Sequence, residues 1–573
     1  MNPPPLHFLR RQPRSQLGRC LFFTLITGAL QAATLDVLIR NGTVYDGSGR
    51  PPVVADVGLA GDRIAAIGRL TNAQARLEID ATGLAVAPGF INMLSWANES
   101  LLVDGRSQSD IRQGVTLEVL GEGMSMGPLN AAMQRDLVAQ QGDLKYEIAW
   151  TTLGEYLDHL VRQGVSCNVA SFVGATTVRV HEIGYANRAP TAAELERMKA
   201  LVRHAMREGA LGLSSALIYA PAFYARPDEL AALARVAGEH GGLYISHIRS
   251  EGARLLEALD EFLAVVRAAR VRGEIYHLKA AGRANWPRMD AALARIEAAR
   301  AAGLPVTANM YCYTAAATGL DAAMPPWVQE GGFQAWVARL RQPAIRARVR
   351  QEMNAPATTW ENFFHLAGSP TNILLTGFRS EALKPLTGKT LAAVAQARGR
   401  SPADTVMDLV IEDGSRVETV YFLMSEENLR RQLQKPWVSL GSDAASLVPE
   451  GVFLKASTHP RAYGNFARFL GQYVRDAQLV PLEEAVRRLT ALPAANLRLD
   501  RRGLLQPGYY ADVVVFDAGA IRDHATYERP HQYATGVEHV FVNGVPVLRA
   551  GMHTGARPGR VVRGPGYAGS AAR

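Results

Sequence analysis

This chain of 573 residues contains few cysteines and few lysines, and it lacks the glycine-rich motifs that bind nucleotides. Three cysteines are too few for the disulfide framework of a small exported domain, and we interpret Cys167 and Cys312 as buried thiols. Lysine supplies only seven of the 62 basic residues, and no basic run interleaved with aromatics occurs, which argues against nucleic-acid binding. Neither a GxGxxG motif nor a P-loop is present, so no nucleotide is expected.

The composition is that of an ordinary globular protein. Hydrophobic residues make up 48% of the chain and charged residues 20%, which fits neither disorder nor a multi-spanning membrane protein. Length alone would suggest about four domains. However, α/β barrels often exceed the usual domain size as single units, so length does not decide the number of domains.

The first 33 residues have the features of an export signal. Four arginines and no acid precede or flank the apolar stretch CLFFTLITGAL, residues 20–30, and the small residues Ala32 and Ala33 follow it. Eleven residues are too few to span a bilayer as a helix. We therefore predict a signal peptide at residues 1–33 and a periplasmic protein, with an uncleaved membrane anchor as the alternative. After removal of this signal no stable membrane span is expected.

Both ends of the remaining chain alternate apolar and polar residues with a period of two. Residues 34–84 contain DVLIRNGTVYDG, and residues 498–573 contain VEHVFVNGVPVLRAG. Asn41-Gly42 and Asn543-Gly544 are the pairs that favour two-residue hairpin turns. We predict that the two ends pair with each other and form one small β-sandwich.

Between the ends, residues 85–497 alternate short apolar runs with amphipathic helical patterns. Strands that alternate with helices imply a parallel sheet, and eight of them imply a closed (β/α)₈ barrel. The stretch at about 314–390 is too long for a plain connection and predicts a helical insertion that caps the barrel mouth. The eight predicted strands are residues 84–91, 115–122, 167–174, 210–219, 243–248, 274–279, 305–313 and 437–443.

Four chemically capable side chains fall at the carboxyl ends of these strands, where barrel enzymes carry their active sites. Of the thirteen histidines, only His247 and His277 do so, on consecutive strands that would lie about 5 Å apart. Glu122 and Asp443 add carboxylates from other strands. Two imidazoles and a carboxylate form a usual zinc set, and a nearby acid can move protons. A hydrogen-bonded core histidine is the alternative for either imidazole alone.

From about residue 35 to 566, the chain resembles the amidohydrolase superfamily and, within it, the N-acyl-D-amino-acid deacylases (D-aminoacylases). The stretches that carry the resemblance include QGVTLEVLGEGMSMGP, YISHIRSEG, HLKAAGRANW and HPRAYGNFARFLGQYVR. Each is weak alone, and their order along the chain makes the match specific. The resemblance implies a barrel with a small β-sandwich, a zinc-activated water, and an N-acylated amino acid or related amide as the small-molecule partner.

The resemblance also implies roles for individual residues. His247 and His277 match the histidines of the family's tight metal site, and Glu122 stands where many members have a bridging cysteine. Asp443 matches the catalytic aspartate, the general base and then acid. A substrate-binding role is implied for Lys279, Arg461, Tyr311 and, more loosely, Tyr219 and Arg283.

The sequence departs from the family pattern in PGFINMLSW. Leu94 and Trp96 replace the histidine pair that forms the second, weaker metal site of relatives, so the resemblance implies one Zn²⁺ per chain. Three hypotheses follow. The first is zinc-dependent hydrolysis of the amide bond of N-acyl-D-amino acids, releasing a carboxylate and a free D-amino acid. The second is hydrolysis of another amide, such as a D-configured dipeptide or a cyclic amide or imide. The third is a metal-free barrel that acts as a binding protein.

Overall fold

The computed structural model of this chain describes residues 35–569. The predicted signal peptide lies outside these residues and stays a prediction. Within the described part, no helix has both the length and the apolar character needed to cross a bilayer. Cys167 and Cys312 are buried and unpaired, as expected.

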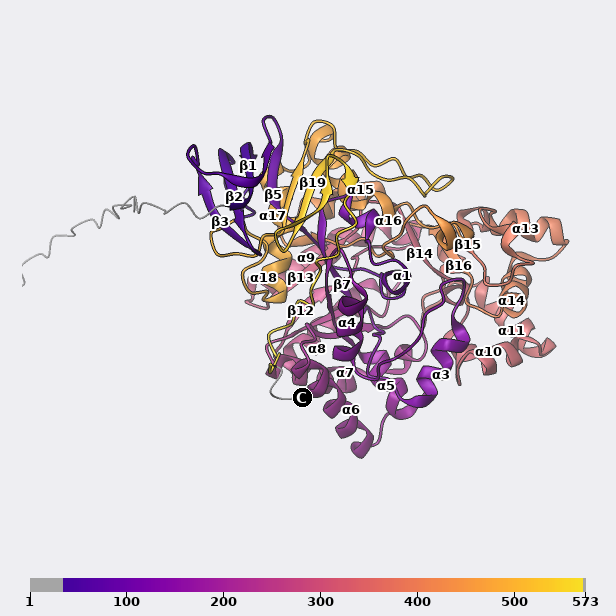
Figure 1. Ribbon diagram of the computed structural model, residues 1–573. Helices are drawn as coiled ribbons and strands as arrows, with labels where there is room; N and C mark the ends of the chain where they lie inside the picture. The colour runs from indigo at the N-terminus through magenta and orange to yellow at the C-terminus, as the bar shows by residue number, and fades with distance from the viewer. Residues whose placement is uncertain (1–34, 570–573) are drawn as a thin grey trace, which may run out of the picture.

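The two ends of the chain share one nine-stranded sheet, in which the indigo N-terminal strands lie beside the yellow C-terminal ones (Figure 1). Its order is β21-β20-β19-β18-β5-β1-β2-β3, with β4 beside β1. Strand β5 joins the halves, because it pairs with both β1 and β18. A separate apolar core that includes Ile39, Val57, Val515 and Phe541 holds this domain together. The strands are β1 (Leu35–Val44), β2 (Val53–Ala60), β3 (Arg63–Gly68), β4 (Ala75–Asp80), β5 (Ala85–Pro88), β18 (Val513–Phe516), β19 (Val537–Val542), β20 (Val545–Arg549) and β21 (Met552–His553).

The two Asn-Gly pairs take different roles. Asn543 and Gly544, both with positive φ, form the predicted two-residue turn between β19 and β20. At Asn41 the predicted turn is wrong. The positive φ of Asn41 instead produces a bulge inside the single strand β1, where the Asn41 N–H donates to Asp56.

The eight predicted barrel runs all form strands, which lie in two parallel arcs. One arc is β6-β7-β8 and the other is β9-β10-β11-β12-β13-β17. Strands β8 and β9 follow each other in the chain, and on the other side Met93 N–H donates to the Leu440 carbonyl at 3.1 Å. These contacts support the predicted barrel. The strands are β6 (Phe90–Asn92), β7 (Val115–Leu120), β8 (Asn168–Ser171), β9 (Val173–Gly174), β10 (Gly212–Ala216), β11 (Leu243–His247), β12 (Arg272–Ile275), β13 (Val306–Met310) and β17 (Val438–Leu440).

Helices with one apolar face cover the outside of the barrel (Figure 1). In α8 the buried residues Leu255, Leu259, Phe262 and Val266 recur at the spacing of a single helical face. The helices between barrel strands include α4 (Leu153–Gln163), α5 (Ala175–Ile183), α6 (Ala192–Arg207), α7 (Pro227–Glu239), α8 (Leu255–Ala269), α9 (Met289–Ala301) and α15 (Glu426–Leu433). Further helices are α1 (Ser100–Val103), α2 (Gln108–Ile111), α3 (Ala131–Gln140), α16 (Arg461–Arg468), α17 (Leu482–Leu489) and α18 (Ala491–Leu497).

The insertion differs from its prediction in extent and in content. It reaches beyond residue 390 and contains the antiparallel sheet β14-β16-β15 beside its helices. Its runs AAATG and ILLTG are short, and they form strands only because ETVYF, further along the chain, pairs with both. Its elements are β14 (Ala315–Gly319), α10 (Phe333–Leu340), α11 (Pro343–Met353), α12 (Phe363–Leu366), β15 (Ile373–Gly377), α13 (Leu391–Arg398), α14 (Pro402–Asp413) and β16 (Glu418–Phe422).

The predicted domain boundaries also shift. Residues 84–91 were expected to form one barrel strand, but β5 belongs to the nine-stranded sheet and only β6 to the barrel. The chain passes between the two at Gly89, where a Cβ would lie 2.2 Å from Thr116 Oγ1. The end of the C-terminal segment leaves the sheet as well, since Val561 bridges Val169 of β8.

We predict that Gly89→Ala destabilises the protein. The new methyl group would meet the buried side chain of Thr116, and overpacking of this kind costs about 1–3 kcal/mol. Urea unfolding followed by circular dichroism measures the loss. Gly142→Ala is the matched control, because a Cβ at Gly142 meets nothing within 4 Å. Equal midpoints for the two variants would contradict the prediction.

Candidate active site

Three predicted ligands meet at the carboxyl ends of barrel strands. Glu122 follows β7, His247 is the last residue of β11, and His277 follows β12. Glu122 Oε1 lies 3.3 Å from His247 Nδ1 and 2.9 Å from His277 Nε2. One ligand atom from each residue falls within 4.8 Å of the others, and all three side chains are buried. This donor set fits a zinc ion, since two imidazole nitrogens and a carboxylate oxygen are ligands that zinc accepts.

The charge of the cluster also favours a cation. Burial raises the pKa of Glu122, but His277 and His247 more than offset this effect and hold it well below its usual range. Burial and Lys279 lower the pKa of His277, whereas Glu122, Asp443 and Glu251 raise it, with a net value of about 9. The acids around this point therefore stabilise positive charge, which a proton or a metal ion can supply.

Glu251 stands behind both histidines and was missed by the sequence analysis. Its Oε1 lies 3.1 Å from His277 Nδ1 and 2.6 Å from Lys279 Nζ, and its Oε2 lies 3.7 Å from His247 Nε2. An acid that accepts from His277 Nδ1 fixes that ring and leaves its Nε2 free to bind, whereas the distance to His247 is too long for a hydrogen bond. The signal was present, because Glu251 follows His247 by four residues in SHIRSEG.

The backbone at two of these positions is held in an uncommon conformation. His277 has φ 31° and Asp443 has φ 51°. Such values are uncommon outside glycine, although Asn, Asp and His tolerate them better than most residues. The His277 N–H donates to Asn309 Oδ1 at 2.9 Å, and the Asp443 N–H donates to the Leu94 carbonyl at 2.8 Å. These contacts turn both side chains toward the cluster.

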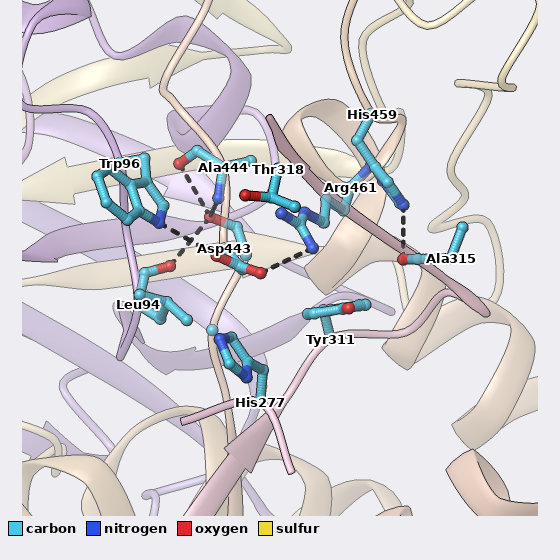
Figure 2. A network of polar contacts seen from close by, with 12 residues as sticks. Leu94, Trp96, His277, Tyr311, Ala315, Thr318, Asp443, Ala444, His459 and Arg461 are labelled. Carbon is cyan, nitrogen blue, oxygen red and sulfur yellow. Dashed lines mark hydrogen bonds and ion pairs between the residues drawn. The ribbon is translucent and has the colours of Figure 1, made fainter. Parts of the chain in front are cut away.

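Asp443 lies between an indole and a guanidinium (Figure 2). Its Oδ1 accepts from Trp96 Nε1 at 3.1 Å, and its Oδ2 lies 2.8 Å from Arg461 Nη1. Burial raises the pKa of Asp443 above its ordinary value, against the opposing effects of Arg461 and His277. A carboxylate with a raised pKa is a better proton acceptor at neutral pH than an exposed one.

Of the predicted substrate-binding residues, Arg461 and Tyr311 lie beside Asp443 (Figure 2). The Arg461 guanidinium stacks 4.5 Å above the Tyr311 ring, whose hydroxyl contacts Met424 Sδ at 3.4 Å. Tyr219 packs edge-on against His247 at 5.5 Å, and its hydroxyl donates to Thr318 on β14.

The other two candidates have different surroundings. Lys279 is buried, and its Nζ contacts Glu251 and His277 Nδ1, at 2.6 and 2.8 Å. Arg283 is exposed at the start of a 3₁₀ helix, Arg283–Arg288, and within residues 35–569 no contact joins it to the cluster. The substrate-binding roles of all five residues, Lys279, Arg461, Tyr311, Tyr219 and Arg283, stay predictions.

The chain is an enzyme with a (β/α)₈ barrel and a cluster of metal-ligand type at the barrel mouth. Residues 77–548 match the model of the Amidohydrolase family, and the chain belongs to this family. D-aminoacylase of Alcaligenes xylosoxydans xylosoxydans is 35% identical over 531 residues, which cover 92% of this chain and 97% of that protein.

Two solved structures extend the comparison. N-acyl-D-glutamate deacylase from Bordetella bronchiseptica, in complex with zinc and a phosphonate that mimics the tetrahedral intermediate, has a TM-score of 0.77 and 32% identity. D-aminoacylase with a binuclear metal centre, described as activated by one metal and attenuated by a second, has a TM-score of 0.76 and 33% identity. Each alignment covers 92% of this chain and 100% of the other.

His459 fixes the backbone of Arg461 and ties it to the insertion. Its Nδ1 accepts from the Arg461 N–H at 3.0 Å, so its Nε2 carries the proton that points to the Ala315 carbonyl, also at 3.0 Å. Burial and the nearby Arg461 lower the pKa of His459 well below its usual value, against the Ala315 carbonyl, which raises it. The folded protein therefore holds this imidazole neutral.

We predict that His459 makes the fold sensitive to mild acid. Unfolded histidine binds a proton below about pH 6.5, whereas the folded His459 does not, so acidification favours the unfolded state. Between pH 6.5 and 5.5 the free energy of unfolding of the wild type should fall by about 1 kcal/mol more than that of His459→Gln. Urea titrations at several pH values measure both. Parallel pH dependences would rule out this role.

Proposed function

We propose that this chain hydrolyses the amide bond of N-acyl-D-amino acids, with one zinc ion per chain, and releases a carboxylate and a free D-amino acid. The observation that carries the proposal is the convergence of Glu122, His247 and His277 opposite Asp443. The deacylase relatives support the substrate class. A buried cluster with ligand geometry also speaks against the metal-free binding protein.

In this proposal Glu122, His247 and His277 would hold a zinc ion, through the oxygen and ring nitrogens that face one another. Bound zinc polarises a carbonyl group and lowers the pKa of water to about 7. Asp443 accepts the proton of the attacking water and delivers it to the departing amine nitrogen, which is why a carboxylate with a raised pKa suits this position.

Arg461 is the group proposed to bind the substrate carboxylate. Its guanidinium is buried, and within the described residues its Nε has no hydrogen-bond partner. A buried donor left unpaired is costly, so a carboxylate that accepts from it binds with a gain in free energy. Tyr311 supports the guanidinium from below through its ring.

We predict that Asp443→Asn abolishes turnover without removing zinc. An amide cannot take the proton, so kcat should fall by at least about 100-fold, the lower range for general acid–base catalysis. Release of free amino acid from N-acetyl-D-amino acids measures turnover, and metal analysis of the same sample should give unchanged zinc. Undiminished turnover would remove Asp443 from its assigned role.

A substrate panel accompanies this variant. N-acetyl-D-amino acids, their L-enantiomers and cyclic amides are compared by kcat/KM with the wild-type enzyme. Preference for the linear D-substrates is expected. A strong preference for a ring would replace the proposed substrate class with that of a cyclic amidase.

We predict that Glu251→Gln weakens zinc binding about 10–100-fold, the usual effect of removing a partner of a ligand histidine. The neutral amide accepts less strongly from His277 Nδ1 and no longer compensates the charge of Lys279. Competition with a chromophoric chelator measures the affinity. The exposed Glu257→Gln on α8 is the control. If both variants held zinc as tightly as the wild type, Glu251 would not orient the ligands.

A further inference from the structure

We propose that the indole N–H of Trp96 takes the place of a second cation, joining Glu122 to Asp443 and limiting the centre to one ion. This inference rests on the proposed function and assigns Trp96 as a positioning residue for the proton-transferring carboxylate. Trp96 is not a catalytic residue in this proposal, because it acts on the reaction only through Asp443 and Glu122.

The geometry is that of one donor shared by two acids. Trp96 Nε1 lies 2.9 Å from Glu122 Oε2 and 3.1 Å from Asp443 Oδ1, both within hydrogen-bond range. Both carboxylates are buried, and two buried anions that approach each other need a positive group between them. Here that group is the N–H dipole. Indole nitrogen only donates and carries no lone pair for a metal.

In each carboxylate one oxygen contacts Trp96 and the other contacts a different partner. Glu122 turns Oε1 toward the histidines and Oε2 toward Trp96. Asp443 turns Oδ2 toward Arg461 and Oδ1 toward Trp96. The hydrogen of the indole thus lies between Glu122 Oε2 and Asp443 Oδ1.

The backbone holds the indole in register with Asp443. Trp96 N–H donates to the Ala444 carbonyl at 2.9 Å, and the Asp443 N–H donates to the Leu94 carbonyl at 2.8 Å. Ser95 bridges Ala444 as well. Two segments that are 347 positions apart in the chain are therefore joined on both sides of the contact. The N–H of Trp96 is preorganised, and its position does not depend on a bound ion.

Within the part of the chain that the structure describes, no other side chain replaces the two ligands that Leu94 and Trp96 cannot supply. Leu94 is buried among hydrocarbon side chains and offers only its carbonyl, which Asp443 N–H already uses. Between residues 35 and 569, Glu122, His247 and His277 form the single group of three or more ligand residues. The proposal therefore predicts that excess zinc adds no second ion and does not attenuate turnover.

The test compares three variants with the wild type. Trp96→Phe keeps an aromatic ring and removes the N–H. The double variant L94H/W96H replaces the leucine and the indole with two imidazoles. Trp327→Phe is the matched control, because Trp327 Nε1 also donates to a carboxylate, Glu352, at 2.9 Å, but within the insertion. Zinc per chain is measured after equilibration with excess zinc and gel filtration, in the absence of substrate. Turnover and KM are measured over a range of zinc concentrations.

The wild type, Trp96→Phe and Trp327→Phe should each hold one zinc ion, and the double variant should hold two. Trp96→Phe should lose about tenfold in kcat with KM changed less than twofold, because Asp443 is misplaced while the substrate contacts remain. Only the double variant should lose turnover as zinc rises. Thermal melts test whether each protein is folded. If the double variant is not folded, the zinc content of the wild type and the kcat of Trp96→Phe still test the proposal.

Two zinc ions in the wild type, none in the wild type, or kcat of Trp96→Phe equal to that of Trp327→Phe would each overturn the proposal. Failure of the proposed function looks different. If the wild type holds one zinc, the double variant holds two, and no N-acyl-D-amino acid is hydrolysed, then the substrate assignment fails and the role of Trp96 in ion number stands.

Discussion

Three buried carboxylates around one point of the barrel mouth are the constraint on which the rest of the site depends. Glu122, Glu251 and Asp443 are each shielded from water, and an unpaired buried charge costs several kcal/mol. Each therefore has its own partner: Glu122 the two histidines, Glu251 the amine of Lys279, and Asp443 the guanidinium of Arg461. One of only seven lysines in the chain is used here.

The order of the barrel strands brings the side chains of the cluster together from distant parts of the chain. Strands β11 and β12 are neighbours and bring His247 next to His277, with ring centroids 4.5 Å apart. The insertion reaches the same region through contacts of Thr318 with Tyr219 and of Ala315 with His459. The residues proposed to surround a substrate therefore come partly from the barrel and partly from the insertion, whereas the proposed ion ligands follow barrel strands alone.

The clustering of Glu122, His247, His277 and Asp443 was predictable from the sequence, because strand ends in a barrel all point to one mouth. Each needed only the apolar run that precedes it. Glu251 was missed although it follows His247 by only four residues, because it lies in a loop rather than at a strand end, and its direction depends on contacts of its backbone with Glu361 and Ala281. The sheet of the insertion was missed since its strands pair over long separations, and the bulge at Asn41 since a positive φ suits a turn equally well.

From the sequence, Trp96 could be interpreted only as the replacement of a metal-binding histidine. Its proposed role depends on where its ring nitrogen points, and that is set by the pairing of its backbone with Ala444.

A neutral donor and a cation differ in their effect on the pKa of Asp443. A divalent ion at this place would stabilise the carboxylate strongly and lower its pKa, which weakens it as a base. An N–H dipole satisfies the same oxygen with a smaller effect on its pKa, and burial keeps the pKa of Asp443 raised. A covalently attached donor is also present at every metal concentration, whereas the occupancy of a second ion depends on mass action. The proposed replacement thus keeps the two acids in place. It also leaves Asp443 a stronger base than it would be beside a second ion.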